Sequence, residues 1–156
     1  MQKRPDIGDP MPDVEMVGPG GTVLKPSDFR GRRLVIFLYP KDDTPGCTTE
    51  NKDFTALAKD FEKAGIVLLG VSKDSPEKHA RFAAKHGLEV PLASDPVDRG
   101  LAEALGIWVE KSMFGRKYMG MERTTYLVSP NGKIEQVWRK VKVKGHAGEV
   151  LDKARS

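Results

Sequence analysis

Two uninterrupted apolar runs most constrain how this chain can fold. They occupy residues 34–39 and 66–71, and runs of this kind are typical of strands that are buried on both faces of a sheet. The segment between them, residues 44–64, places apolar side chains at helical spacing. A strand, a helix and a second strand in this order predict a parallel crossover unit.

Turn residues and changes of apolar period predict the remaining elements. Residues 13–25 are expected to form an N-terminal hairpin, and Ser75 is the expected cap of a helix that ends at Gly87. The later expected elements are a strand over residues 88–93, a helix over 96–105, a loop or loose hairpin over 107–120, strands over 124–128 and 134–141, and a closing helix over 146–154. This order predicts an α/β fold with a central mixed β-sheet flanked by helices, and periodicity alone leaves several three-layer folds open.

The chain has the size and composition of one soluble globular domain. Its 156 residues are 38% hydrophobic and 31% charged, and no linker divides them, so we expect a single domain over residues 1–156. No apolar run approaches the ~20 residues of a membrane span, and residues 1–6 lack the apolar stretch of a signal peptide. These features predict a cytoplasmic protein with no membrane partner.

Basic residues are in excess but do not form a block. The formal net charge is +4, and lysine and arginine are spread among 22 acidic residues. The densest basic stretch, residues 139–144, alternates with valine, which favours the solvent-facing side of an edge strand. A nucleic-acid groove would need an aromatic ladder, and only Trp138 stands nearby, so we expect no nucleic-acid partner.

The only cysteine, Cys47, lies where a helix is expected to begin. Thr44 is the expected N-cap and Pro45 the first helical residue, which puts Cys47 at about the third position. The first turn of a helix presents unpaired N–H groups and the positive end of the helix dipole, and both favour a thiolate. A lone cysteine is often a small buried hydrophobe, but one that follows Thr-Pro-Gly at a helix start is not a core position. The pattern therefore favours an activated, catalytic cysteine.

The residues around Cys47 also resemble a known family. Residues 37–42 and 44–50, with the run Thr-Pro-Gly-Cys-Thr, are similar to the active-site signature of AhpC/TSA-like thiol peroxidases, specifically the bacterioferritin-comigratory-protein or Q-type branch of the peroxiredoxins. Further segments resemble that branch in the same order, at residues 70–75, 92–95, 118–128 and 141–146. The resemblance implies a thioredoxin-like fold, with Cys47 at the start of the helix after the central strand. It also implies reduction of hydrogen peroxide and of organic hydroperoxides, without a metal, haem or flavin cofactor.

The loop before Cys47 carries candidate groups for peroxide reduction. A thiolate attacks one peroxide oxygen while the other leaves with the negative charge, so donors fixed around both oxygens lower the barrier. Gly46 has no side chain to obstruct the peroxide, and the Thr44 hydroxyl is expected to donate a hydrogen bond to it. Pro40 and Pro45 are expected to stiffen the loop and to shield Cys47 from water.

Two further site residues are expected beyond this loop. An exposed helix terminus stabilises a charge by only ~0.3–1 kcal/mol, so a permanent cation is needed nearby. The resemblance nominates Arg123, whose planar fork can donate to sulfur and peroxide together. Glu50 lies one helical step beyond Cys47 and is expected to hold that guanidinium, although a first-turn acid is also favoured by the helix dipole alone.

The chain departs from the family in having no second cysteine. Many members of the branch carry a resolving cysteine five residues after the first, where this chain has Lys52, and others carry it in the following helix, where this chain has no cysteine up to Gly87. The sulfenic acid of Cys47 must then be reduced by a thiol from outside the chain, and thioredoxin, glutaredoxin and glutathione all remain open. We expect a monomer or a weak homodimer.

Other functions are less favoured by these residues. The main alternative is a redox-sensing or holdase-type binding protein in which oxidation of Cys47 acts as a switch. A disulfide oxidoreductase is weaker still, because the chain lacks a Cys-x-x-Cys motif. The histidines do not indicate a metal site, because His79 and His86 are seven residues apart on one expected helix and His146 lies elsewhere.

Overall fold

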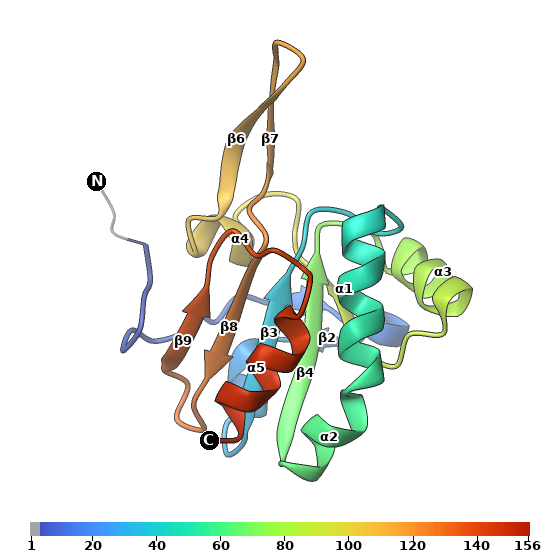
Figure 1. Ribbon diagram of the computed structural model, residues 1–156. Coiled ribbons are helices and arrows are strands. Elements are labelled where there is room, and N and C mark those ends of the chain that lie inside the picture. The colour runs from blue at the N-terminus through green and yellow to red at the C-terminus, as the bar shows by residue number, and fades with distance from the viewer. Residues whose placement is uncertain (1–3) are drawn as a thin grey trace.

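A computed structural model describes residues 4–156 of the chain. Residues 1–3, part of the segment searched above for a signal peptide, lie outside the described residues. The centre of the fold is a seven-stranded sheet with the strand order β2-β1-β5-β4-β3-β8-β9, and a separate two-stranded ribbon, β6-β7, projects from one end (Figure 1).

The sheet is mixed, as expected. β3 pairs in parallel with β4 and antiparallel with β8, and β4 pairs in parallel with β5. The strands are β1 (Met16–Val17), β2 (Val23–Leu24), β3 (Arg33–Leu38), β4 (Ile66–Ser72), β5 (Leu92–Ser94), β6 (Trp108–Met113), β7 (Arg116–Met121), β8 (Thr124–Val128) and β9 (Ile134–Trp138). The helices are η1 (Pro19–Gly21), η2 (Pro26–Phe29), α1 (Pro45–Ala56), α2 (Ala58–Lys63), α3 (Pro76–His86), α4 (Leu101–Ala104) and α5 (His146–Ala154).

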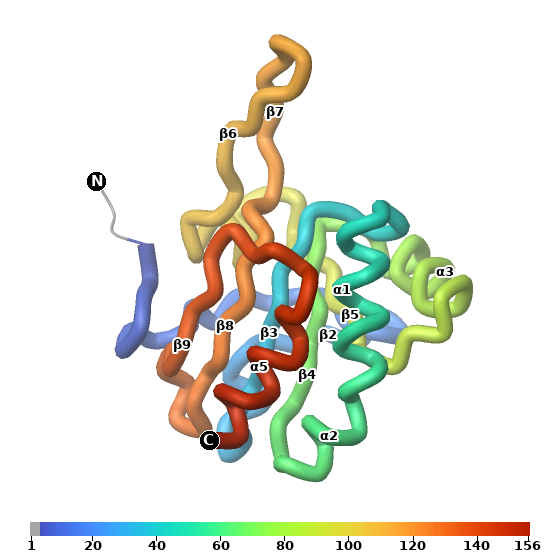
Figure 2. Tube along the Cα trace, viewed as in Figure 1, coloured from blue at the N-terminus to red at the C-terminus, as the bar shows by residue number. Residues whose placement is uncertain are grey.

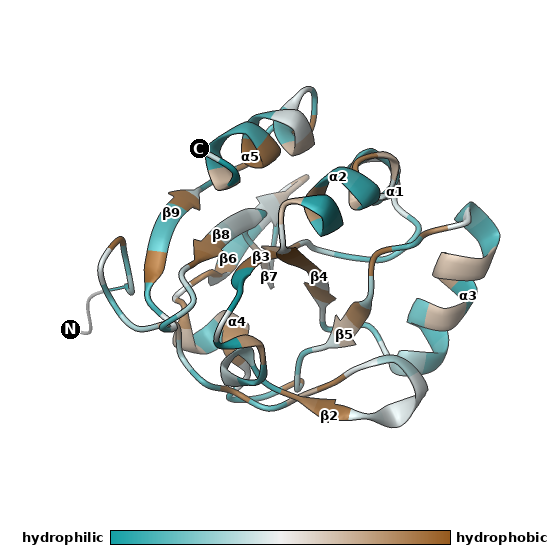
Figure 3. Cartoon of the chain, turned by 90° about the horizontal axis from the view of Figure 1, so that it is seen from below, coloured by the Kyte–Doolittle hydropathy of each residue, from teal (hydrophilic) through white to brown (hydrophobic). Residues whose placement is uncertain are grey.

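The central strand β3 is buried on both faces, as its uninterrupted apolar run predicts. Successive side chains of a strand point to opposite faces. Leu34 and Ile36 therefore join the core on the side of α4, whereas Val35 and Phe37 join the core beneath α1, α2 and α5. Figure 3 shows the sheet between these two layers of helices. α1 and α5, which are far apart in the sequence, lie side by side on the sheet (Figure 2).

Three sequence-based expectations are confirmed at residue level. The N-terminal hairpin forms, with β1 and β2 paired antiparallel. Ser75 caps α3 by accepting a hydrogen bond from the Lys78 N–H at 3.2 Å, and Gly87 ends this helix in the left-handed region (φ 62°). The closing helix is α5.

The helix expected over residues 44–64 is interrupted at Leu57. α1 ends directly before this residue and α2 begins directly after it, and its φ and ψ are −102° and 4°. Its N–H donates to the carbonyl of Phe54, three residues back, at 3.1 Å, so the first helix closes in a tight turn. Across the break, Phe61 still packs against Phe54 with ring centroids 6.0 Å apart, which keeps both rings in the core.

Two elements are shorter than expected because residues just before them delay their start. The strand expected over residues 88–93 begins only at Leu92, after Pro91, which has no N–H for a ladder. The helix expected over residues 96–105 begins only at Leu101. The Asp95 carboxylate accepts hydrogen bonds from the N–H groups of Leu101 and Ala102 at 2.6 and 3.0 Å, and this cap from outside the helix fixes the start.

The segment expected as a loop or loose hairpin over residues 107–120 is a regular two-stranded ribbon. β6 and β7 pair from Trp108 opposite Met121 to Met113 opposite Arg116. The two turn residues between the strands both have positive φ, 53° at one and 77° at the other. That geometry matches the right-handed twist of the flanking strands, which is why two-residue hairpins favour it.

The basic stretch over residues 139–144 is not the edge strand that its alternation predicted. β9 is the edge strand, but it ends at Trp138. Lys140 follows with a positive φ of 48°, which is incompatible with an extended strand. The Val141 N–H donates instead to the carbonyl of Arg123 at 3.0 Å, so this stretch packs beside the start of β8.

Candidate active site

Cys47 lies in the first turn of α1, just beyond the end of β3. Thr44 has extended backbone angles (φ −93°, ψ 155°) directly before the helix, and Pro45 is its first residue. Cys47 is therefore the third helical residue, as the sequence predicts. It is a free thiol, only 1% exposed and packed in the core cluster with Phe54, so the expectation that this is not a core position was wrong. It still lies in the first turn, where unpaired N–H groups and the dipole favour negative charge.

Arg123 reaches Cys47 because of the register between β3 and β8. Leu38, the last residue of β3, pairs with Thr124, the first residue of β8. Arg123 consequently lies beside the chain as it leaves β3, although 76 positions separate it from Cys47 in the sequence. Its Nη2 donates to the Cys47 Sγ at 3.3 Å. This is the only cation that the resemblance nominated, and the structure places it against the sulfur.

Glu50 contacts the other side of the Arg123 guanidinium. Nη1 of Arg123 donates to Oε1 of Glu50 at 2.6 Å, and Glu50 is only 1% exposed. We call Cys47, Glu50 and Arg123 the reactive cluster. Gly46 leaves room for it, since a Cβ at this position would be 3.1 Å from Nη2 of Arg123. Glycine at position 46 thus makes space for the guanidinium, a reason that the sequence did not show.

Burial dominates the charge state of Glu50. Removal from water raises its pKa to about 7, although the adjacent Arg123 acts in the opposite direction. Its second oxygen, Oε2, is buried without a hydrogen-bond partner among residues 4–156. For Arg123, burial lowers the pKa, but the charges of Glu50 and Cys47 outweigh burial and raise it. The guanidinium therefore stays charged, while the Glu50 carboxyl changes charge near neutral pH.

The Thr44 side chain makes a different contact from the expected one. It precedes the helix, as predicted, but its hydroxyl does not cap α1 and instead donates to the carbonyl of Lys41 at 2.8 Å. With its proton directed at that carbonyl, the oxygen keeps lone pairs that can accept a hydrogen bond. Pro40 is half-buried at the start of the same loop, and Pro45 is exposed at the first position of the helix.

Sequence reasoning missed a buried cluster behind the active-site loop. The cluster consists of Tyr39, Asp42 and His79, and we call it the loop latch. The Tyr39 hydroxyl donates to Oδ1 of Asp42, and Nδ1 of His79 contacts Oδ2, each at 2.6 Å. His79 comes from α3, and no spacing in the sequence connects it with the loop. The only local signal was an acidic residue shortly after a buried strand.

The other two histidines have ordinary protein partners. His86 contacts Oδ1 of Asp43 at 2.8 Å, and His146 contacts Oγ1 of Thr125 at 2.8 Å in the core. Burial, and then the charge of Arg123, lower the pKa of His146 to about 4, so its ring is neutral at neutral pH. In the described range, 4–156, no group of three or more His, Cys, Asp or Glu side chains is arranged to hold a metal ion. None of the helices in that range is both long and apolar enough to cross a membrane.

Known proteins are similar in sequence to this chain over nearly its whole length. Residues 7–137 match the AhpC/TSA family. Peroxiredoxin Bcp of Bacillus subtilis is 46% identical over 146 residues, which cover 94% of this chain and 92% of that protein. Peroxiredoxin Bcp of Xanthomonas campestris is 50% identical over 139 residues, which cover 89% of this chain and 86% of that protein.

Solved structures share the fold as well. The bacterioferritin comigratory protein of Xanthomonas campestris, studied for its alkyl peroxide reduction activity, superposes with a TM-score of 0.85 at 47% identity, covering 91% of this chain and 90% of that one. A cysteine-to-serine mutant of Xylella fastidiosa PrxQ gives a TM-score of 0.90 at 39% identity, covering 97% of this chain and 96% of that one.

The chain therefore belongs to the AhpC/TSA family. Within it, the chain is a peroxiredoxin of the Bcp/PrxQ branch, with a thioredoxin-like fold and Cys47 as its single cysteine. Its class of activity is that of a thiol-dependent peroxidase. The alternative function, a redox sensor or holdase, is not favoured by these relatives.

Proposed function

We propose that Cys47 attacks the peroxide directly and that Arg123, Glu50 and Thr44 assist it. The observation that carries the proposal is the guanidinium donor 3.3 Å from the Cys47 Sγ. The thiolate attacks the terminal oxygen of R–O–O–H, so an S–O bond forms while the O–O bond breaks. The leaving R–O⁻ takes up a proton and departs as an alcohol or water. Sulfur is oxidised to a sulfenic acid, and the peroxide is reduced.

Arg123 is proposed to stabilise the charge as it moves. Nη2 donates to the sulfur, and the guanidinium has further N–H groups for the peroxide oxygens. Because negative charge passes from sulfur to the leaving oxygen, a cation that touches both stabilises the transition state more than the ground state. Glu50 orients this fork through its 2.6 Å contact with Nη1, and Gly46 keeps the approach open.

Thr44 is proposed to orient the peroxide by accepting a hydrogen bond from its O–H end. The direction of this bond follows from the donation of the Thr44 hydroxyl to the Lys41 carbonyl at 2.8 Å. Such a bond would point the attacked oxygen toward Sγ, which is the alignment that in-line attack needs. Pro40, with its fixed φ, is proposed to limit the motion of the loop that carries Thr44.

The reductant is proposed to be a thiol from outside the chain, because Cys47 is the only cysteine. One external thiol condenses with the sulfenic acid to a mixed disulfide and water, and a second thiol releases Cys47 and leaves as a disulfide. Thioredoxin, glutaredoxin and glutathione all satisfy this chemistry. Mass spectrometry after one equivalent of peroxide should find sulfenic acid, a mixed disulfide with the added thiol, or a dimer linked through Cys47. An unmodified Cys47 would contradict this part of the proposal.

Substrate range, assembly and location complete the proposal. Organic hydroperoxides are proposed as substrates besides hydrogen peroxide, since the Xanthomonas campestris relative has been studied for alkyl peroxide reduction. We further propose a monomer or weak homodimer that works in the cytoplasm, where a lone free cysteine stays reduced.

A single-turnover experiment tests the proposed function. The reduced protein is mixed with one equivalent of hydrogen peroxide, and the remaining thiol is trapped and counted over time. We expect a second-order rate that exceeds that of a free cysteine by several orders of magnitude. A rate equal to that of a free thiol would refute the assignment of Cys47 as a peroxidatic residue.

A further inference from the structure

The loop between β3 and α1 contains a carboxylate that is buried away from water. Asp42 is only 2% exposed, so its oxygens need partners within the protein. Oδ1 accepts a hydrogen bond from the Tyr39 hydroxyl, and burial raises the pKa of Tyr39, so this hydroxyl keeps its proton. Oδ2 faces Nδ1 of His79 at 2.6 Å. The carboxylate is thus held from both sides.

His79 lies between two groups that can only accept hydrogen bonds. Its ring is 4% exposed, with Nδ1 against Asp42 and Nε2 3.1 Å from the carbonyl of Ala93 on β5. An ionised carboxylate and a carbonyl can only accept, so with Asp42 ionised both contacts are hydrogen bonds only if both ring nitrogens carry a proton. In that state the ring is an imidazolium that neutralises the buried charge of Asp42.

Two further contacts attach the same loop to α3 and its N-terminal end. The Asp42 N–H donates to Oδ2 of Asp74 at 2.7 Å, and Asp74 in turn pairs with Lys78 at 3.0 Å. Asp43, held in the left-handed region (φ 62°), contacts His86 at 2.8 Å. The Asp43 side chain is 42% exposed, so water screens its contact, whereas the contact between Asp42 and His79 is buried.

We propose that His79 is a positioning residue for peroxide reduction. Its imidazolium holds Asp42, and Asp42 fixes the path of the loop that carries Thr44 and leads into the first turn of α1. His79 acts on the peroxide through this loop, whereas Arg123 reaches the sulfur from the residue just before β8. The inference rests on the proposed roles of Cys47 and Thr44, because it says which residues keep these two side chains in place relative to each other.

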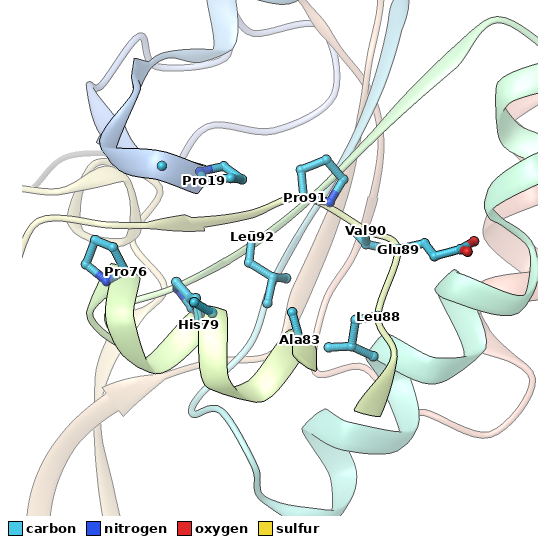
Figure 4. Close-up of a pocket in the computed structure, with 11 residues that line it drawn as sticks. Pro19, Pro76, His79, Ala83, Leu88, Glu89, Val90, Pro91 and Leu92 are labelled. Atoms are coloured by element: carbon cyan, nitrogen blue, oxygen red, sulfur yellow. The ribbon is translucent and has the colours of Figure 1, made fainter. Parts of the chain in front are cut away.

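A cavity beside His79 makes the proposal testable by chemical rescue. The ring lines a cavity of about 320 Å³ between α3 and the chain that enters β5 (Figure 4). Most of the other lining residues are apolar, among them Pro76, Ala83, Val90 and Leu92. If the ring were removed, its space would join this cavity, and imidazole from solution could enter it.

The test compares His79→Ala with His86→Ala, a matched control on the same helix. Two rates are measured for each protein: oxidation of Cys47 by hydrogen peroxide, and alkylation of Cys47 by iodoacetamide, which does not need a bound peroxide. In His79→Ala we expect the peroxide rate to fall by up to about 100-fold. Alkylation should stay at the wild-type rate, and imidazole should restore part of the peroxide rate. Both rates should be unchanged in His86→Ala.

A second variant covers the case in which His79→Ala does not fold. Asp42→Asn keeps the shape of the pair, because the amide can donate to a neutral His79 ring that still donates to the Ala93 carbonyl. We expect a smaller loss of the peroxide rate than in His79→Ala. Nitrogen-15 NMR should show both ring nitrogens of His79 protonated in the wild-type protein and only one in Asp42→Asn. A singly protonated ring in the wild-type protein would overturn the proposal.

The kinetic outcomes separate this inference from the proposed function. A wild-type peroxide rate in His79→Ala would overturn the positioning role. Equal losses of the peroxide and alkylation rates would also overturn it, because the thiol rather than the loop would then have changed. If the wild-type protein itself reacted with peroxide no faster than a free thiol, the proposed function would fail instead.

Discussion

The reactive cluster and the loop latch each contain a buried carboxylate, but the two carboxylates are satisfied to different degrees. Glu50 gives one oxygen to Arg123, and within the described chain its other oxygen has no partner. Asp42 has both oxygens paired, with Tyr39 and His79. Unused hydrogen-bonding capacity in a buried site is costly. Of these two carboxylates, the one with unused capacity lies in the reactive cluster, and the fully paired one lies in the loop latch.

The largest effect is expected from removing the reacting atom. Cys47→Ser keeps a side chain of similar size but has no thiolate, so peroxide consumption should fall to the uncatalysed background. Circular dichroism should show the wild-type fold, because serine fits the same helical position. Turnover above background in this variant would mean that a group outside the reactive cluster reduces peroxide.

The next largest effect is expected at Arg123. Loss of one charge-stabilising donor costs about 10²–10³-fold in rate in comparable sites, so we expect a loss of that order for Arg123→Ala. Arg123→Lys keeps the charge but loses the planar fork, so its rate should lie between those of the wild-type protein and Arg123→Ala. Stopped-flow rates with hydrogen peroxide check this, with Arg155→Ala, at an exposed position near the chain end, as the control. Wild-type rates in both Arg123 variants would remove Arg123 from the reaction.

A smaller effect is expected from Glu50→Gln, and it should depend on pH. Burial raises the pKa of Glu50 to about 7 from its ordinary value of 4.5, so between these values the folded protein holds a proton that the unfolded chain has released. The unfolding free energy of the wild-type protein should therefore fall as pH rises through this window, by up to roughly 3 kcal/mol from this group, and level off above it.

Glu50→Gln removes this titrating group and should flatten that part of the profile. Urea unfolding of both proteins at about pH 5 and pH 8 measures the difference. The peroxide rate should fall less than in Arg123→Ala, because the glutamine oxygen can still accept a hydrogen bond from the guanidinium. Identical pH profiles for the two proteins would show that the titration of Glu50 does not change the unfolding free energy.

The smallest effect is expected in α1 itself. Two positions five apart in a helix have Cα atoms about 8.6 Å apart, beyond the ~7 Å limit for a disulfide. Relatives with such a pair must unwind, whereas this chain has the exposed Lys52 at the second position. Hydrogen exchange over residues 44–54 should therefore stay the same in the reduced and sulfenic forms. Strong deprotection on oxidation would show that the start of α1 unwinds even when no resolving disulfide forms.

The correct predictions came from signals that lie close together in the chain. A buried strand, a threonine before the helix and a proline at its start were enough to place Cys47 in the first turn. The same kind of evidence placed Ser75 as the cap of α3 and predicted the strand over residues 124–128. In each case the residues that carry the signal lie within the element that they predict, or next to it.

The errors arose where a distant contact outweighed the local pattern. Asp95 caps α4 from outside the helix and delays its start. The alternation over residues 139–144 predicted a strand, but the chain turns at Lys140 and Val141 bonds to the carbonyl of Arg123. Helical spacing over residues 44–64 gave no sign of the break at Leu57, because the apolar face continues across it.

By itself the sequence determined the α/β class, and it predicted Cys47 as the reacting residue and an external thiol as its reductant, since these follow from periodicity, one helix start and one cysteine. Only the tertiary structure decided that Arg123 meets the sulfur, that the Thr44 hydroxyl donates to the Lys41 carbonyl, and that His79 contacts Asp42. These contacts depend on the register of β3 against β8 and on the packing of α3. They involve single side chains at the ends of elements, where burial imposes no repeating pattern that a sequence could display.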